Sequence, residues 1–285
     1  MLPEIFGNVN LVRLCTADKE IVRLIAMNRF ASRGEIGRNL IGLKEGYNLY
    51  RRLRHLQRIG LIELLTGDGE TTLGYRLTRR GVKFARRNRF VPGDAVHSRP
   101  AFKTQFDHDQ IVNEARQILS TSPIISGFVG ELVLRSRIGK CRVSATRGAD
   151  HEWKVPDAMF TLSTSRGSMT TALEVELTQK AKARYSKIVA TLLTSKSFEF
   201  VFFICRDEKL KALIRNQIAK ARATNALVRA SNRSNGIYFC TLTDLRVNGL
   251  DAVWEGEDTR FSINELASVK RESLIPAVKT EVSQV

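Results

Sequence analysis

Two stretches, Val155-Pro156-Asp157-Ala158 and Leu173-Glu174-Val175-Glu176-Leu177, decide the fold of the region around them. At the two-residue period of a β-strand, one face of this region is apolar and consists of Ala158, Phe160, Leu162, Leu173, Val175 and Leu177. The opposite face carries Asp157, Glu174 and Glu176. The residues from Thr164 to Ser168 are typical of a turn, so the pattern predicts a β-hairpin.

The predicted hairpin gathers negative charge on one face. A symmetric hairpin that turns at Ser165 and Arg166 sets Asp157 directly across from Glu174. Because like charges that face each other destabilise a sheet, three carboxylates on one polar face indicate a bound cation. Two alternatives stay open: a solvated face that is acidic by chance, and a metal site kept for structure without turnover.

Length and charge favour two domains and a polyanionic partner. The chain has 285 residues, enough for two domains that each bury a core. Its 46 Lys and Arg against 29 Asp and Glu give a net charge of +17, which favours nucleic acid over the alternative of a generic basic surface. Cys15, Cys141, Cys205 and Cys240 form no Cys-x-x-Cys pair, as expected of reduced thiols rather than of a zinc site or a disulfide framework. No apolar run reaches the ~18 residues of a membrane span, so we expect a cytoplasmic protein without membrane insertion.

The first ninety residues follow the pattern of a DNA-binding domain. Asp18 is expected to cap a helix that extends to Phe30, and Ser32 to cap a short second helix. A third helix over residues 44–58 has an apolar stripe of Leu49, Leu53 and Leu56. Strands at residues 61–65 and 71–77 flank a tight loop, and Thr78 caps a closing helix. This order predicts a winged helix-turn-helix domain over residues 1–90.

The third predicted helix carries the residues expected to meet DNA. The N-terminal part of such a helix contacts base edges, so the expected base readers are Tyr47, Asn48, Arg51 and Arg52. Phosphate contacts, which position a protein without reading sequence, are expected from Arg54, Arg58, Arg79 and Arg80, and Lys44 lies at the start of the same helix. The alternative is a winged helix that binds another protein, with the arginines as a solvated face.

Residues 91–102 contain Pro and Gly and predict a linker, and residues 103–270 predict an α/β domain. A helix over residues 106–119 carries His108 and Glu114 as accessory candidates, and the segment 128–137 fits either a strand or a helix. After the hairpin, a helix to about residue 193 carries Arg184 and Tyr185, followed by a strand (198–205), a helix (207–222) and a strand (237–240). The fold class is α/β, α+β overall, with a mixed sheet. Residues 271–285 are weakly patterned and predict a disordered tail.

The hairpin motif resembles the PD-(D/E)xK core of restriction-endonuclease-like nucleases. The resemblance lies in Pro156-Asp157, the hairpin, and Glu174-x-Glu176 on a strand that leads into a helix. It implies that Asp157 and Glu174 hold a divalent metal, Mg²⁺ or Mn²⁺, which prefer carboxylate oxygens. The chain departs from the family pattern at Glu176, which stands where the usual Lys would be. Lys180, about one helical turn further on, then supplies the missing cation.

A fuller pattern is similar to the plasmid replication-relaxation family, and in particular to the C-type mobilization relaxases. It comprises the winged helix, the His-headed helix, Pro-Asp-Ala, Leu-Glu-Val-Glu-Leu-Thr-x-Lys and the Arg-Tyr pair at 184–185, over roughly residues 15–245. The resemblance implies metal-dependent nicking of double-stranded DNA at a transfer or replication origin. Other relaxosome or coupling proteins are then expected partners, and a homodimer stays open.

The resemblance also implies roles for single residues. Asp157 and Glu174 are metal ligands, Glu176 is a third ligand or a base acting through water, and Lys180 stabilises the phosphate. Tyr185 has the nearby hydroxyl that a covalent DNA link would need, although its place on an apolar stripe favours packing. Two other functions stay open, namely a non-catalytic DNA-binding accessory or regulator and a double-strand endonuclease of restriction or transposition type.

Overall fold

A computed structural model describes residues 14–40, 47–66, 72–91, 103–141, 155–165, 167–181, 197–224 and 236–274, together with residues 185, 188, 192 and 195. The chain divides into two compact units. One consists of residues 1–100 with 135–142, and the other of residues 101–134 with 143–285. The division at residue 100 falls within the predicted linker, most of which lies outside the described residues.

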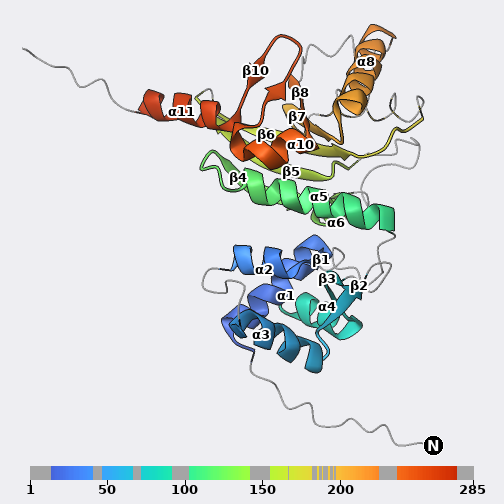
Figure 1. The fold of residues 1–285 in the computed structure, drawn as a ribbon, viewed down its shortest axis with the longest axis vertical. Helices are drawn as coiled ribbons and strands as arrows, with labels where there is room; N and C mark the ends of the chain where they lie inside the picture. Colours follow the sequence, from blue (N-terminus) through green and yellow to red (C-terminus); the bar gives the residue numbers. More distant parts are fainter. Residues whose placement is uncertain are drawn as a thin grey trace, which may run out of the picture. The chain divides into compact units, whose positions relative to one another are not determined.

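The N-terminal unit combines helices with a small antiparallel sheet (Figure 1). Its elements are α1 (Thr16–Asn28), β1 (Phe30–Ala31), α2 (Arg33–Asn39), α3 (Tyr47–Arg58), β2 (Ile62–Thr66), β3 (Thr72–Leu77) and α4 (Arg79–Arg87). The strand order is β1-β3-β2. Ile21 and Ile25 of α1 and the predicted stripe Leu49, Leu53 and Leu56 of α3 are fully buried, so the apolar faces of these helices form the core of the unit.

The helix starts of this unit confirm two predicted caps and correct a third. The Ser32 hydroxyl accepts the Glu35 amide hydrogen at the start of α2, and the Thr78 hydroxyl accepts that of Gly81 at the start of α4. The prediction that Asp18 caps α1 is wrong, because Cys15 is the capping residue. Asp18 lies in the first turn, and its carboxylate accepts the Cys15 amide hydrogen at 3.2 Å. The first helix also ends before Phe30, which lies instead in β1 and pairs with Arg76 of β3.

Gly81 of α4 lies very close to the backbone at Leu61, just before β2. A Cβ at this position would lie 2.0 Å from the Leu61 carbonyl oxygen. The substitution Gly81→Ala must therefore push α4 away from the start of β2, and we expect it to lower the free energy of unfolding by at least ~2 kcal/mol. Urea denaturation measures this loss. Lys83→Ala, at an exposed position of the same helix, is the control, with an expected change within ~0.5 kcal/mol. Equal stability of the two variants would contradict the close packing.

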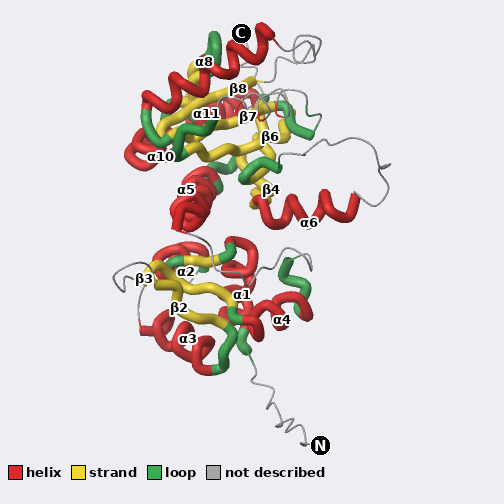
Figure 2. Tube along the Cα trace, turned by 90° about the vertical axis from the view of Figure 1, so that its right-hand side faces the viewer, coloured by secondary structure: helices red, strands yellow, loops and turns green. Residues whose placement is uncertain are grey.

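The second unit is built around a seven-stranded mixed sheet (Figure 2). Its elements are α5 (Lys103–Leu119), β4 (Ile125–Gly130), the first turn of α6 (Glu131–Cys141), β5 (Ala158–Thr164), β6 (Gly167–Glu176), β7 (Phe200–Cys205), α8 (Glu208–Thr224), β8 (Gly236–Thr241), α10 (Leu242–Asn248), a 3-10 turn at Gly249–Asp251, β9 (Trp254–Glu255), β10 (Arg260–Phe261) and α11 (Ile263–Leu274). The rest of α6, from residue 135, belongs to the N-terminal unit. The order is β10-β9-β8-β7-β6-β5-β4, in which β6, β7 and β8 run parallel and the other pairs antiparallel.

The predicted hairpin is present with the predicted register. Ala158 pairs with Leu173 and Thr164 with Gly167, so the next positions along the ladder are Asp157 and Glu174. The predicted apolar face is confirmed, since it packs into a core with residues of α5, α10 and α11. The other face of the sheet packs against α8 and against Tyr185, Ile188 and Leu192.

Two ambiguous or weak stretches of the sequence are ordered elements. The segment that fitted a strand or a helix is divided at residue 130, where β4 ends and α6 begins. The predicted tail from residue 271 is wrong for its first part, because α11 continues to Leu274. Residues 275–285 lie outside the described residues.

Candidate functional site

Asp157 lies at the open end of the β5–β6 hairpin. Its Oδ2 accepts the Val175 amide hydrogen at 2.8 Å, and its backbone carbonyl accepts that of Glu131 at 2.8 Å. The side chain thus continues the ladder where the backbone pairing of β5 and β6 ends. Strand register and hydrogen bonding therefore fix Asp157 beside Glu174, as the sequence predicted.

His108 of α5 reaches the same carboxylate. Its Nε2 lies 3.1 Å from Asp157 Oδ2, and its Nδ1 lies 3.5 Å from Asp109 Oδ1. Burial disfavours the imidazolium, but the hydrogen bonds and charges of Asp109 and Asp157 outweigh it and raise the pKa of His108 to about 10. His108, one of the accessory candidates, thus lies against Asp157, where its charge can orient that carboxylate.

Glu174 and Glu176 are buried side chains. Each is 1 % exposed, which contradicts the alternative of a solvated acidic face. They lie on the face of β6 that packs against α8, and their register neighbours on β7 are Phe203 and Cys205. A buried carboxylate is stable only when it is paired, hydrogen-bonded or bound to a cation. Both glutamates therefore need a nearby cation or hydrogen-bond donors.

Lys180 is the cation nearest to Glu176 in the sequence and is bound to it in the structure. Its ammonium group donates a hydrogen bond to Glu176 Oε1. The Lys180 amide donates to the Tyr185 hydroxyl at 3.2 Å, and that hydroxyl donates to the Thr178 carbonyl at 3.4 Å. Tyr185 is 1 % exposed and packs in the core on the α8 side of the sheet, while Arg184 lies outside the described residues. The tyrosine thus fixes the segment that presents Lys180.

The Glu176–Lys180 pair predicts a specific pattern of stability. Lys180→Met leaves Glu176 buried without its cation and is expected to cost ~2 kcal/mol or more, whereas Glu176→Gln combined with Lys180→Met is expected to cost less than the single change. Urea denaturation of the wild type, both single variants and the double variant gives the coupling energy. Additive losses would show that the two side chains do not interact in solution.

The three predicted carboxylates do not form one cluster. Within the described part of the chain, no three His, Cys, Asp or Glu side chains gather closely enough to hold a metal ion. Asp157 is bound by Val175 and His108, and Glu176 by Lys180. The donor set nevertheless fits a hard cation at Asp157 and Glu174, since Mg²⁺ is commonly held by one or two carboxylates together with water and substrate phosphates.

Glu114 is committed elsewhere. Its carboxylate forms a bidentate ion pair with Arg246 of α10, at 2.9 and 2.8 Å. This pair ties α5 to α10, so Glu114, an accessory candidate in the sequence, is bound to Arg246.

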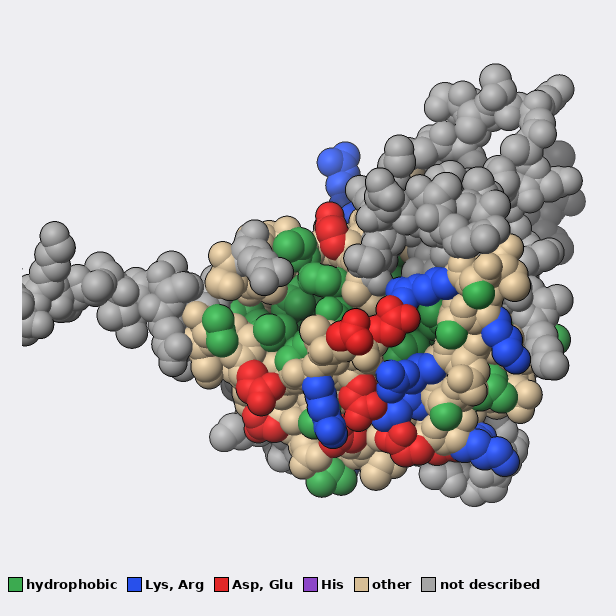
Figure 3. Space-filling view, turned by 90° about the horizontal axis from the view of Figure 1, so that it is seen from above, with side chains coloured by type: hydrophobic (Ala, Val, Ile, Leu, Met, Phe, Trp, Pro, Cys, Tyr) green, Lys and Arg blue, Asp and Glu red, His purple; other side chains and the backbone are tan. Residues whose placement is uncertain are grey.

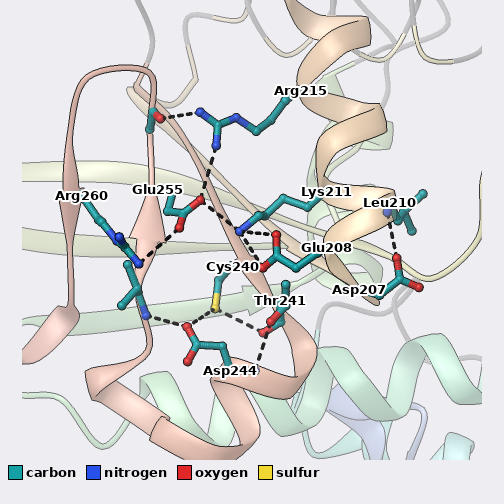
Figure 4. Close-up of polar contacts among 12 residues, drawn as sticks. Asp207, Glu208, Leu210, Lys211, Arg215, Cys240, Thr241, Asp244, Glu255 and Arg260 are labelled. Carbon is teal, nitrogen blue, oxygen red and sulfur yellow. Dashed lines mark hydrogen bonds and ion pairs between the residues drawn. The ribbon is translucent and has the colours of Figure 1, made fainter.

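A second polar network, which the sequence did not reveal, lies where β7 and β8 end (Figure 4). Lys211 of α8 donates to Glu208 at 2.8 Å and to Glu255 of β9 at 3.0 Å, and Arg215 also reaches Glu255 at 3.4 Å. Burial disfavours the charged amine, but these two glutamates outweigh it and raise the pKa of Lys211. The network thus crosslinks α8 to β9. Its residues come from segments far apart in the sequence, so no local spacing could have predicted it.

Cys205 borders both Glu176 and this network. Burial, followed by the charge of Glu176, raises the pKa of its thiol to about 12, so the thiol stays protonated at neutral pH and is not a nucleophile.

The surface of the second unit that faces the viewer in Figure 3 carries both kinds of charge, with Lys and Arg side chains next to Asp and Glu. Among the side chains coloured in that view, charges of the two signs are therefore mixed.

Of the residues predicted to contact DNA, most of those that the structure describes are exposed and one is paired. Asn48, Arg51, Arg54 and Arg58 are exposed, as are Arg79 and Arg80 at the start of α4. Arg52 instead donates to Asp18 at 3.1 Å and to the Cys15 sulfur at 2.7 Å. The side chain of Tyr47 and all of Lys44 lie outside the described residues. Exposed basic side chains thus follow the helix that the sequence predicted to contact DNA.

Comparison of the chain with protein-family models, with curated proteins and with solved structures gave no match. Among the described residues, no helix is both long and apolar enough to cross a membrane.

Proposed function

We propose that the protein binds double-stranded DNA and nicks one strand, with a divalent metal, at an origin of transfer or replication of a plasmid or mobile element. The observation that carries the proposal is the register of the β5–β6 hairpin, which sets Asp157 beside a buried Glu174. The proposal puts the protein in the cytoplasm, where such DNA resides.

The order of elements in the N-terminal unit supports the DNA-binding half of the proposal. Helix, strand, helix, helix, two-stranded hairpin and helix is the order of a winged helix-turn-helix, with α3 in the place of the recognition helix. Arg51, Arg54 and Arg58 are exposed on α3, and the chain as a whole carries a net charge of +17. A basic recognition helix fits a polyanionic duplex better than it fits a protein surface of mixed charge.

The topology of the second unit supports the nuclease half. An antiparallel β4-β5-β6 meander followed by the parallel strand β7 fits the restriction-endonuclease-like core that the Pro156-Asp157 and Glu174-x-Glu176 motifs resemble. In such a core the carboxylates lie at the end of the hairpin, which is the position of Asp157 and Glu174 here.

In the proposed reaction, each side chain of the site has a separate role. A bound Mg²⁺ or Mn²⁺ would polarise the scissile phosphate and stabilise charge on the leaving oxygen. Asp157 and Glu174 would hold the ion, and His108 keeps Asp157 oriented and ionised. Lys180, 22 % exposed at its side chain, can leave one face of its ammonium to a phosphate while Glu176 holds the other. Glu176 then positions Lys180 and is not a metal ligand.

A non-catalytic DNA-binding accessory or regulator is the second candidate. The specific observation that favours it is the engagement of Glu176 by Lys180, together with the lack of a three-ligand cluster among the described residues. Such a protein would use the same N-terminal unit and would keep the hairpin only for its fold.

The test is cleavage of supercoiled plasmid that carries the origin, with Mg²⁺ or Mn²⁺ and with EDTA as the control. Metal-dependent open-circular product supports nicking, and linear product supports a double-strand endonuclease. Tight binding without cleavage under either metal would overturn the enzymatic proposal in favour of the accessory.

A further inference from the structure

A basic hollow in the N-terminal unit lies along α3. It encloses about 450 Å³ and is lined by Asp18, Tyr50, Arg51, Arg52, Arg54, His55 and Arg58. Four of these seven side chains are arginines and one is a carboxylate, so the hollow is strongly positive. Such a surface favours an anionic ligand.

Three of the arginines repel one another without a compensating acid. Arg51 and Arg54 are three residues apart and Arg54 and Arg58 four residues apart on α3, spacings at which side chains of like charge destabilise a helix. The helix itself contains no Asp or Glu, and among the described residues none of the three forms an ion pair with a carboxylate. An anion held between them would remove this repulsion.

Tyr50 fixes the central arginine. The guanidinium carbon of Arg54 lies 5.2 Å from the centre of the Tyr50 ring, and Tyr50 is 45 % exposed. An arginine stacked on an aromatic ring loses little freedom when it binds, because its planar group is already oriented.

Arg52 forms part of the wall of the hollow, where it is paired with Asp18. Asp18 and Cys15 hold its Nη1, and its Nε is buried without a hydrogen-bond partner among the described residues. The hydrogen bond and charge of Asp18 outweigh the effect of burial and raise the pKa of Arg52. A guanidinium held in this way joins α3 to the start of α1, so Nη1 is already committed to a contact within the unit.

We infer that this hollow binds successive phosphates of a duplex DNA backbone, with the Tyr50-stacked Arg54 as the central ligand and Arg51 and Arg58 on either side. Arg51 and Arg58 are seven positions apart, about 10 Å along the helix, a distance that is longer than a single phosphate and fits an extended polyanion. The inference rests on the proposed DNA partner and changes the role of Arg51 from base reading to phosphate binding. Sequence reading is then left to Asn48 and the residues before it.

The test measures binding of a fluorescein-labelled 20-base-pair duplex to the full chain by anisotropy over a series of KCl concentrations. Arg54→Ala is expected to weaken binding at least about fivefold and to reduce the slope of log K against log salt by about one. Tyr50→Ala is expected to weaken binding about as much with no change of charge, whereas Tyr50→Phe stays within about twofold because it keeps the ring. Arg23→Ala, an exposed arginine of α1 outside the hollow, is the charge-matched control and should bind like the wild type.

Circular dichroism confirms that each variant is folded. If the wild type binds the duplex and both Arg54→Ala and Tyr50→Ala bind equally well, the hollow is not the phosphate site, although the DNA partner stands. If pyrophosphate or ATP binds the hollow and the duplex does not, the assignment to a DNA backbone is overturned. If the wild type does not bind any duplex, including origin DNA, this inference and the proposed function fail together.

Discussion

The substitution Asp157→Asn is expected to lower the rate of plasmid nicking about a hundredfold or more. In the wild type the Asp157 carboxylate accepts the Val175 amide hydrogen at 2.8 Å. Asparagine retains an oxygen that can accept the same hydrogen bond, so the end of the hairpin should stay intact. What the variant loses is the negative charge that pairs with His108 and that would hold a divalent cation. Glu174→Gln removes the second charge from a side chain that is 1 % exposed, and we expect a loss of the same size. Both rates are measured from the appearance of open-circular plasmid.

The control for both variants is Asp251→Asn, which removes an equal charge from an exposed position far along the chain from the hairpin. Because Asp157→Asn also removes the charged partner of His108, its thermal midpoint is expected below that of the control, and the rates are compared at a temperature where both variants are folded. Nicking by Asp157→Asn at the wild-type rate would remove this residue from the reaction. A loss of activity in the Asp251→Asn control as well would point to a general effect of charge.

Trp254→Ala is expected to have the largest effect on stability. Trp254 is fully buried, and its ring centre lies 4.4 Å from that of Phe202, which is fully buried on β7. Removal of a buried indole leaves a cavity and typically costs ~3–5 kcal/mol, which is a large fraction of the stability of a domain. Urea denaturation followed by tryptophan-independent circular dichroism measures the change.

Trp254→Phe tests how much of the loss comes from the aromatic contact itself. The indole Nε1 is buried without a hydrogen-bond partner among the described residues, so phenylalanine loses no hydrogen bond and keeps most of the aromatic contact. We expect it to cost less than half as much as alanine. Equal losses for the two variants would show that shape around the indole, and not apolar burial, governs this core.

The hairpin could be predicted from the sequence because its signals are local. Alternation places Ala158, Phe160 and Leu162 on one face, and the turn fixes the register, so that every pair from Ala158–Leu173 to Thr164–Gly167 follows. Strands β1, β9 and β10 could not be predicted, since each has two residues and exists only through its partner strand. The burial of Trp254 could not be predicted either, because it depends on the neighbouring strands and helices. The segment around Trp254 has no apolar period of its own that would reveal it.

The sequence predicted where the candidate site residues lie along the strands, but not all of the side chains that they contact. The placement of Asp157 next to Glu174 follows from register alone, and the ion pair of Glu176 with Lys180 joins residues that are close in sequence. The commitments of Glu114 to Arg246 and of Arg52 to Asp18 join residues far apart, so the sequence left both side chains available for function. Long-range ion pairs of this kind are not visible in a local pattern.

Binding of Mn²⁺ to the full chain tests the central claim most directly, because it needs no knowledge of the DNA sequence that is recognised. Isothermal titration calorimetry of the wild type, Asp157→Asn and Glu174→Gln gives the affinity and the number of ions bound. The account predicts a single ion per wild-type chain and a loss of affinity of at least about tenfold in each variant. A wild-type chain that binds no Mn²⁺, or that binds it with an affinity unchanged by both substitutions, would contradict a metal-dependent site at this hairpin.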